Sequence, residues 1–245
     1  MVLLLQYTLI FASVLTLVAL GGCFSEHSGV INIGLEGSMV MGALGGALMV
    51  KYLPSTMAAP LVILLVILGS VIVGMVFSLF LGVAAIHFNA DQTLVGTALN
   101  LLGPAAAVVI VRAINMSESI DNVSSTVAYK EAKKAFLVNI GKFEFSWFML
   151  LALLILIASY IILYKIRFGL RLMACGELPQ AADSVGINVY KMRYAGVLIS
   201  GALGGLVYST AGVSEWKFEN GVAGFGFLYY FSDRPCLCIK ELQST

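Results

Sequence analysis

Five stretches of this 245-residue chain contain no Asp, Glu, Lys or Arg. They are residues 1–25, 52–90, 92–111, 145–164 and 194–214, and a sixth stretch, 27–50, is interrupted only by Glu36. A bilayer core about 30 Å thick is crossed by roughly 20 apolar helical residues, so each stretch is long enough to span it. Lipid cannot hydrogen-bond to exposed peptide groups, and the stretches lack the alternating polarity of barrel strands. We therefore expect an all-α fold, a polytopic transmembrane helical bundle of about six membrane helices.

The composition agrees with a membrane protein, because 60% of the residues are hydrophobic and 11% are charged, with a mean hydropathy of +0.98. A net charge of +1 argues against a nucleic-acid partner. The four cysteines do not have the spacing of metal ligands, so we expect neither a metal site nor a disulfide framework from Cys23, Cys175, Cys236 and Cys238.

The helices and loops can be placed from the same pattern. We predict helices at about 3–22, 35–51, 59–86, 92–113, 146–165 and 193–213. Two hydrophilic loops remain, at about 114–145, where the charges are mixed, and at about 166–192. Five basic residues lie close to the helix ends that flank the second loop: Lys165, Arg167, Arg171, Lys191 and Arg193. The positive-inside rule therefore favours a cytoplasmic second loop and an external first one.

Motifs for catalysis are missing from the sequence. There is no Gly-x-x-x-x-Gly-Lys-Ser/Thr phosphate loop, so any ATP-driven work must come from a partner. There is likewise no His-Glu-x-x-His metal motif and no Gly-x-Ser-x-Gly nucleophile elbow, and the two histidines, His27 and His87, lie apart. We expect a chain that is not an enzyme and that holds no cofactor of its own.

Polar residues at membrane depth are costly and usually face a cavity, a partner or a pathway. Asn32 and Glu36 are four apart and would share a face in a helix, but three glycines in residues 29–37 predict a broken one. A broken helix is tolerated at membrane depth where it lines a cavity, which makes this segment a candidate for a solute path. A surface loop with Glu36 in water is the equal alternative.

A second polar face is predicted in residues 92–100. Thr97 and Asn100 are three apart and would lie on one helix face together with Thr93 and Gly96. A hydrogen bond between helices is the favoured role, and contact with a solute is the alternative.

The loop at 168–188 is too polar for lipid, yet it contains a candidate docking element. Ala181, Ala182, Val185 and Ile187 would give a short helix one apolar face, with Gly186 near its end. Such a helix on the membrane surface suits docking into a groove on another protein. A simple connection is the alternative.

These polar segments are also where the sequence resembles a known family, the membrane permeases of ABC importers for nucleosides and related simple sugars. Residues 25–37 (SEHSGVINIGLEG) resemble the opening signature of that family, and residues 89–102 (NADQTLVGTALNLL) resemble its second block. The third block comprises 167–171, 176–193 and 198–205. The three blocks occur in order over most of residues 10–228.

The third block is also similar to the general coupling loop of ABC permeases, Glu-Ala-Ala-x-x-x-Gly, with Gln180 in place of the glutamate. The resemblance implies that this loop docks into an ATP-binding subunit. The coupling residues would be Gly176, Glu177, Gln180, Ala181, Ala182, Asp183 and Gly186. By the same resemblance, the segment at 32–37 lies near the solute path.

The resemblance implies a permease subunit in a bacterial plasma membrane that imports nucleosides or related small polar solutes. Its partners would be an ATP-binding subunit, a second permease, an extracytoplasmic solute-binding lipoprotein and the lipid bilayer. Riboflavin or simple sugars are the alternative cargo. A stand-alone secondary carrier is the alternative from another class, and an inactive truncated remnant is a third.

One region departs from the family pattern. We expect a permease domain at 1–228, after which residues 229–245 are polar and unlike the membrane helices that relatives have there. A frameshift or premature stop near Leu228 is our hypothesis for this tail.

Overall fold

The computed structural model describes residues 2–53, 59–118, 137–140 and 143–211. The six predicted long helices are present: α1 (Val2–His27), α2 (Leu35–Tyr52), α3 (Ala59–Gly82) with the π-helical turn η1 (Val83–His87), α4 (Gln92–Glu118), α5 (Trp147–Tyr164) and α8 (Val189–Ala211). Two shorter helices, α6 (Arg167–Glu177) and α7 (Pro179–Ser184), connect α5 to α8. The predicted all-α bundle is therefore confirmed. The tail at 229–245 lies outside the described residues.

Length and hydropathy identify some of these helices as membrane spans. In the described residues, two helical stretches are long and apolar enough to cross a membrane, Leu64–His87 and Gln92–Ser117. A third is counted if Leu150–Tyr164 and Arg167–Glu177, which meet at a 68° bend, form one broken span. Leu35–Met49 is a shorter apolar helix. The total of six spans stays a prediction.

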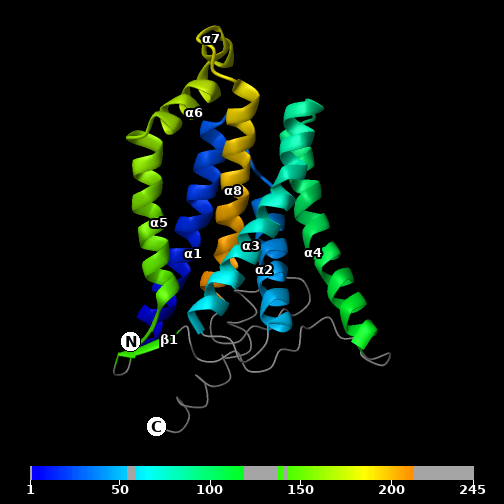
Figure 1. Ribbon diagram of the computed structural model, residues 1–245, viewed down its shortest axis with the longest axis vertical. Helices are drawn as coiled ribbons and strands as arrows, with labels where there is room; N and C mark the ends of the chain where they lie inside the picture. The colour runs from blue at the N-terminus through cyan, green and yellow to red at the C-terminus, as the bar shows by residue number, and fades with distance from the viewer. Residues whose placement is uncertain (1, 54–58, 119–136, 141–142, 212–245) are drawn as a thin grey trace.

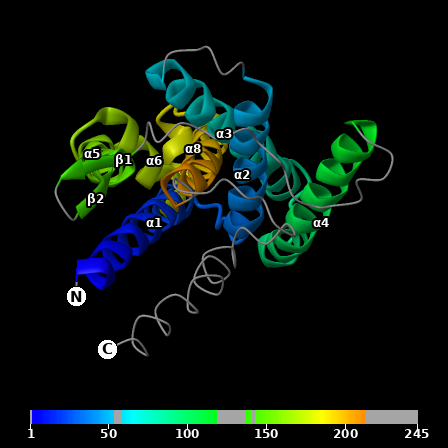
Figure 2. The same cartoon turned by 90° about the horizontal axis from the view of Figure 1, so that it is seen from below.

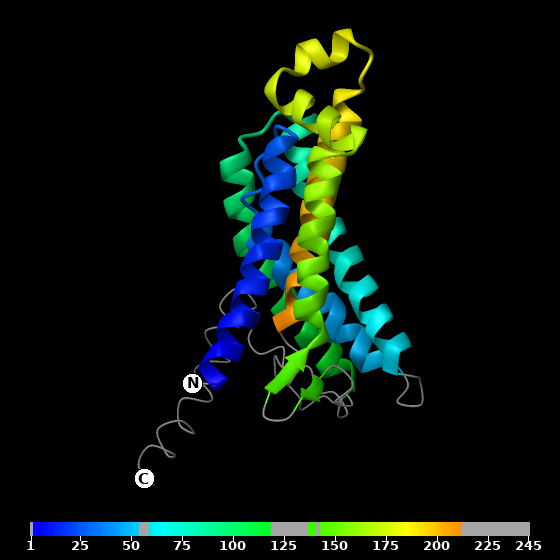
Figure 3. The ribbon, with the colours of Figure 1, turned by 90° about the vertical axis from the view of Figure 1, so that its left-hand side faces the viewer.

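The helices form a bundle with two flanking members. Helix α8 packs against α1, α2 and α3, and α2 also packs against α3, while α5 packs on α1 and α4 packs mainly on α2. Figures 1 and 2 show α5 and α4 on opposite sides of this group. Helices α6 and α7 lie at one end of the bundle, and the N-terminus and β1 lie at the other, which Figure 3 shows from the side.

Glycines permit the closest helix crossings. A Cβ built on Gly42 would collide with the backbone of Gly205, and one built on Gly74 would lie 2.5 Å from the Gly201 carbonyl oxygen and 2.9 Å from the Gly205 Cα. Small residues let helices approach until dispersion forces between backbones become effective in lipid. Gly42, Gly74, Gly201 and Gly205 therefore bring α2 and α3 into close contact with α8.

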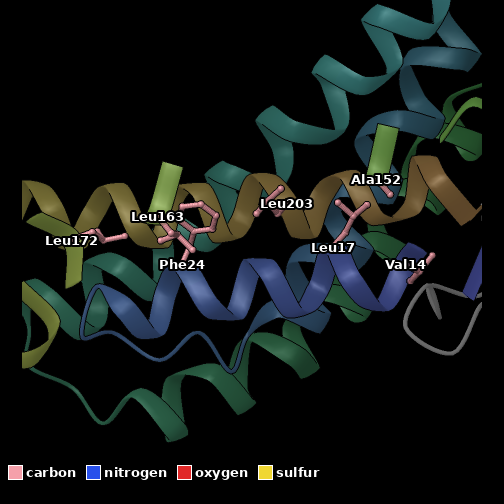
Figure 4. Close-up of a cluster of buried hydrophobic side chains, with 7 residues drawn as sticks. All are labelled: Val14, Leu17, Phe24, Ala152, Leu163, Leu172 and Leu203. Carbon is pink, nitrogen blue, oxygen red and sulfur yellow. The ribbon is translucent and has the colours of Figure 1, made fainter. Parts of the chain in front are cut away.

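A hydrophobic cluster fixes the bend between α5 and α6. Phe24 of α1 is 1% exposed, and Leu163 of α5 and Leu172 of α6 are 2% and 0% exposed in the same cluster. Figure 4 shows Leu163 against Phe24, with Leu172 beyond them and Leu17, Leu203, Val14 and Ala152 continuing the cluster along α1 and α8. The start of the polar connection is thus anchored to α1.

Three local elements differ from the predictions. Helix α6 lies where the sequence pattern predicts a loop, because Gly169 and Gly176 interrupt that pattern; Gly169, Leu172 and Cys175 are nevertheless its buried side. The predicted loop at 114–145 begins later, since α4 continues to Glu118. It also contains an antiparallel hairpin of β1 (Leu137–Ile140) and β2 (Phe143–Ser146), in which Leu137 pairs with Ser146.

Substituting Gly74 with alanine tests the helix crossing. The added Cβ forces α3 away from α8, and we expect Gly74→Ala to lower the free energy of unfolding by about 1–3 kcal/mol. The control is Gly22→Ala, whose Cβ would meet only Leu35 Cδ1 at 3.8 Å. Thermal unfolding in one detergent measures both, and equal melting temperatures would contradict the packing described above.

Candidate functional site

The chain breaks between α1 and α2, as the glycines predicted. Gly29 ends α1 with a positive φ of 79°, a conformation that glycine adopts at no steric cost. The Val30 N–H donates to the Ser25 carbonyl at 3.3 Å, and the Ser25 hydroxyl donates to the Val30 carbonyl at 2.5 Å. Residues 28–34 are not helical. Figure 1 shows this blue segment running from the upper end of α1 to the start of α2, partway down the bundle.

Asn32 lies inside the bundle at mid-depth. Its side chain is 5% exposed, and Nδ2 donates to the Ser200 hydroxyl at 2.9 Å. Ser200 is the twelfth of the 23 residues of α8 (Val189–Ala211), so the contact lies near the middle of that helix. Asn32 Oδ1 is buried and accepts no hydrogen bond among the described residues.

Glu36 lies on a different surface from Asn32. It belongs to the first turn of α2 and is exposed, whereas Asn32 faces α8. The two residues do not share a helix face, because the non-helical segment and the first turn of α2 separate them. Their roles along a solute path stay predictions.

Asn100 on α4 bridges the start of α2. Its Oδ1 accepts from the Gly37 N–H, and its Nδ2 donates to the Ile33 carbonyl, both at 2.9 Å. The Gly37 N–H belongs to the first turn of α2, where backbone donors have no partner within the helix. The asparagine therefore makes the hydrogen bond between helices that the sequence favoured.

Thr97 does not join Asn100 in this contact. Its hydroxyl is within 3.0 Å of the Thr93 and Leu94 carbonyls of its own helix, and the residue is exposed. Thr97 is therefore available on the outer side of α4, and its contact with a solute stays a prediction.

Sequence reasoning missed several residues that hold the segment. Gln92 Oε1 accepts from the Ile31 N–H at 2.8 Å, and Ser200 is the partner of Asn32. A Cβ on Gly96 would lie 2.8 Å from Ile33 Cβ, and one on Gly103 would lie 2.8 Å from Gly37 Cα. Gly96, Asn100 and Gly103 follow the spacing i, i+4, i+7 of one helix face, which is the signal that could have identified this contact.

Pro104 adds a further polar group to this region, the backbone carbonyl of Asn100. Pro104 lies inside α4, and it has no N–H to donate to the Asn100 carbonyl four residues earlier. Membrane helices tolerate such a proline where other groups satisfy the freed carbonyl. The start of α2 and the neighbouring part of α4 thus offer neutral hydrogen-bonding groups and one carboxylate.

The described residues contain no group of three or more His, Cys, Asp or Glu side chains that could hold a metal ion. Within residues 28–37 and 92–104, Glu36 is the one acidic or basic side chain. The arrangement suits recognition of a neutral polar molecule by hydrogen bonds rather than acid–base or metal chemistry.

The predicted docking element is a real helix, but its apolar residues point in two directions. Ala182 is 4% exposed, its carbonyl accepts from the Ile187 N–H at 3.1 Å, and Ile187 is partly buried. Ala181 is exposed, and Val185 is 78% and Leu178 66% exposed. The single face predicted for Ala181, Ala182, Val185 and Ile187 is therefore wrong, because α7 is only six residues long and the chain turns at its end.

The remaining predicted coupling residues lie in α7 or directly next to it. Glu177, Gln180 and Asp183 are exposed or partly exposed. Gly186 ends the element with a φ of 84°, and a Cβ there would meet nothing within 4 Å. Gly176 is partly buried and lies at the last turn of α6. The outer surface formed by Leu178, Ala181 and Val185 is hereafter called the outer face of α7.

Comparisons with known proteins point to a transport permease. The family model described as branched-chain amino acid transport system / permease component matches residues 4–230. A guanosine ABC transporter permease protein of Bacillus subtilis is 41% identical over 232 residues, covering 90% of this chain and 71% of that protein. A nucleoside ABC transporter permease protein of Lactococcus lactis is 37% identical over 229 residues, with the same two shares. No solved structure matches.

Removing the Asn100 side chain tests the bridge at the start of α2. Asn100→Ala leaves the Gly37 N–H and the Ile33 carbonyl without partners, and we expect a loss of about 1–3 kcal/mol in unfolding free energy. Thr97→Ala removes only bonds within its own helix and should change stability by less than about 0.5 kcal/mol. Thermal unfolding in detergent measures both. The same small effect in both variants would rule out the bridge as a stabilising contact.

Proposed function

The chain belongs to the family of permease components of branched-chain amino acid transport systems, and on that premise we propose that it imports nucleosides such as guanosine. It is a multi-pass membrane subunit of an ABC transporter. The observation that carries the cargo proposal is the 41% identity to the guanosine permease over 90% of this chain.

The neutral polar groups around the start of α2 support this cargo. A nucleoside is uncharged and rich in hydroxyl, amide and ring-nitrogen groups, which neutral hydrogen-bonding partners recognise. Glu36, Thr97 and the Asn100 carbonyl would line the path. Asn32 would support the path without lining it, since the hydrogen bond to Ser200 keeps its side chain buried in the conformation described.

Energy for transport would come from partner subunits. An ABC permease works with ATP-binding and substrate-binding partners. In our proposal two ATP-binding subunits hold Mg-ATP, this chain pairs with a second permease, and a lipoprotein delivers the solute outside a bacterial plasma membrane. The chain itself has no ATPase activity. Closure of the nucleotide subunits would favour one orientation of the path over the other through their differential affinity for the two states.

The outer face of α7 would be the docking surface for the ATP-binding subunit. Its apolar residues are exposed at the end of the bundle, and Figure 3 shows α7 beyond the long helices. Exposed apolar side chains that lie together often mark a surface that binds another protein. Glu177, Gln180 and Asp183 would form the polar rim around that contact. Ala182 would support the helix from inside rather than contact the partner.

Uptake of radiolabelled guanosine tests the cargo proposal. Vesicles that contain this chain with its partner subunits are expected to accumulate guanosine only when ATP and the binding protein are present. Unlabelled adenosine and uridine should compete, whereas leucine, glucose and riboflavin in tenfold excess should not. Uptake that leucine, glucose or riboflavin abolishes, or that nucleosides leave unchanged, would assign a different cargo.

A charge on the outer face of α7 tests the docking proposal. Val185→Asp places a carboxylate in a contact that excludes water, and we expect the ATP-binding subunit to bind roughly tenfold more weakly or worse. Val185→Thr keeps the shape of the side chain and serves as the control. Co-purification in detergent measures the retained partner, and full retention by Val185→Asp would remove α7 from the docking surface.

A further inference from the structure

The last turn of α6 touches the beginning of the broken segment through two glycines. A Cβ on Gly29 would lie 3.2 Å from Gly176 Cα and 3.5 Å from the Gly176 carbonyl oxygen. A Cβ on Gly176 would lie 2.5 Å from the His27 carbonyl oxygen and 3.1 Å from the Gly29 nitrogen. A side chain on Gly176 would collide with α1 and one on Gly29 would be tightly crowded, so the contact is backbone against backbone.

We propose that Gly29 and Gly176 are positioning residues that transmit movement of the docking element to the start of α2. This inference rests on the proposed function, because it assumes that an ATP-binding subunit moves α7. Residues in this contact would act on the path through the segment at 28–34, without touching the solute.

The docking side of the contact is closely tied to α7. Gly176 is followed by Glu177, Leu178 and the first residue of α7, Pro179, so a displaced α7 pulls directly on this turn. Helix α6 is also held against α1, since Leu172 and Cys175 are both 0% exposed. A packed interface of this kind shifts as a unit rather than absorbing the movement.

The connection from Gly29 to the start of α2 is also short. Five residues separate Gly29 from Leu35, the first residue of α2. Hydrogen bonds to Ser25, Gln92, Ser200 and Asn100 hold this segment at successive positions. Such a short segment, bonded at four successive residues, has little slack, so a shift of Gly29 changes the position of Ile33 and of the first turn of α2.

A cation lies at the same contact. A Cβ on Gly29 would be 3.7 Å from Arg193 Nη2, and Arg193 Nε is buried without a hydrogen-bond partner among the described residues. The C-terminal ends of α1 and α6 meet here, and the partial negative charge of two helix ends favours a nearby guanidinium. Because Arg193 belongs to α8, the joint includes α8 as well as α1 and α6.

A thiol reporter at Glu36 tests this transmission without depending on the cargo. The complete complex carrying Glu36→Cys is labelled with a thiol reagent, once with ATP and vanadate and once without nucleotide. In each condition, the labelling rate of the complex without this substitution is subtracted as background. We expect the two rates to differ roughly two- to thirtyfold, the range of coupling that a packed contact can carry. Equal rates would overturn the proposal, because nucleotide would then not move the start of α2.

Alanine substitutions then locate the transmission. In the reporter chain, Gly176→Ala and Gly29→Ala should bring the ratio of the two rates close to one while the ATP-binding subunit stays bound. Gly22→Ala is the control, because a Cβ there would meet only Leu35 Cδ1 at 3.8 Å.

Four results separate the possibilities. An unchanged ratio in both glycine variants, the same loss in Gly22→Ala, or release of the ATP-binding subunit by both variants would each overturn the positioning role. Failure of the unsubstituted complex to transport guanosine, with the nucleotide effect on labelling of the Glu36→Cys reporter retained, would refute only the proposed cargo and support the positioning role.

Discussion

The peptide groups of the broken segment must find hydrogen-bond partners inside the bundle, and this requirement organises the structure around it. Lipid offers no donors or acceptors, and each unsatisfied group there costs several kcal/mol. Ser25 closes the end of α1, Gln92 takes the Ile31 N–H, and Asn100 takes two backbone groups near the start of α2. Two of these three side chains come from the region of α4 that packs on α2. The position of α4 therefore follows from the hydrogen bonds that the non-helical segment requires.

Long charge-free stretches predicted the long helices well, because spanning a bilayer imposes both length and composition. The ends were less predictable. Helix α1 continues through polar residues to His27. The Nδ1–H of His27 donates to the Cys23 carbonyl at 2.7 Å, so this polar side chain forms its hydrogen bond within its own helix. Helix α6 was missed because Gly169, Arg171 and Gly176 interrupt its apolar residues. Its helical state depends on burial of Leu172 against α1 and α5, a tertiary contact that no local pattern contains.

The candidate site was predictable in its residues but less so in its geometry. Three glycines in nine residues correctly indicated a break, and Asn100 was correctly identified as a polar contact between helices. The direction of each side chain was not available from spacing, since a non-helical segment does not follow helical periodicity. Asn32 therefore faces Ser200 while Glu36 is exposed. The same limit explains α7, where a six-residue helix and a turn send Ala182 inward and Val185 outward.

The break joins the two ends of the proposed mechanism within a few residues. Gly29 lies against the last turn of α6, and Gly37, eight residues later, lies against Gly103 of α4. Both contacts are between backbones, where no flexible side chain can absorb a displacement. A continuous helix in place of this segment would pass movement along its own axis, whereas a non-helical segment bonded at residues 30–33 moves with its partners. In the proposed mechanism, movement at the docking end would therefore reach the polar groups of α4 through hydrogen bonds, and Asn100 and Gln92 would serve the mechanism as well as the fold.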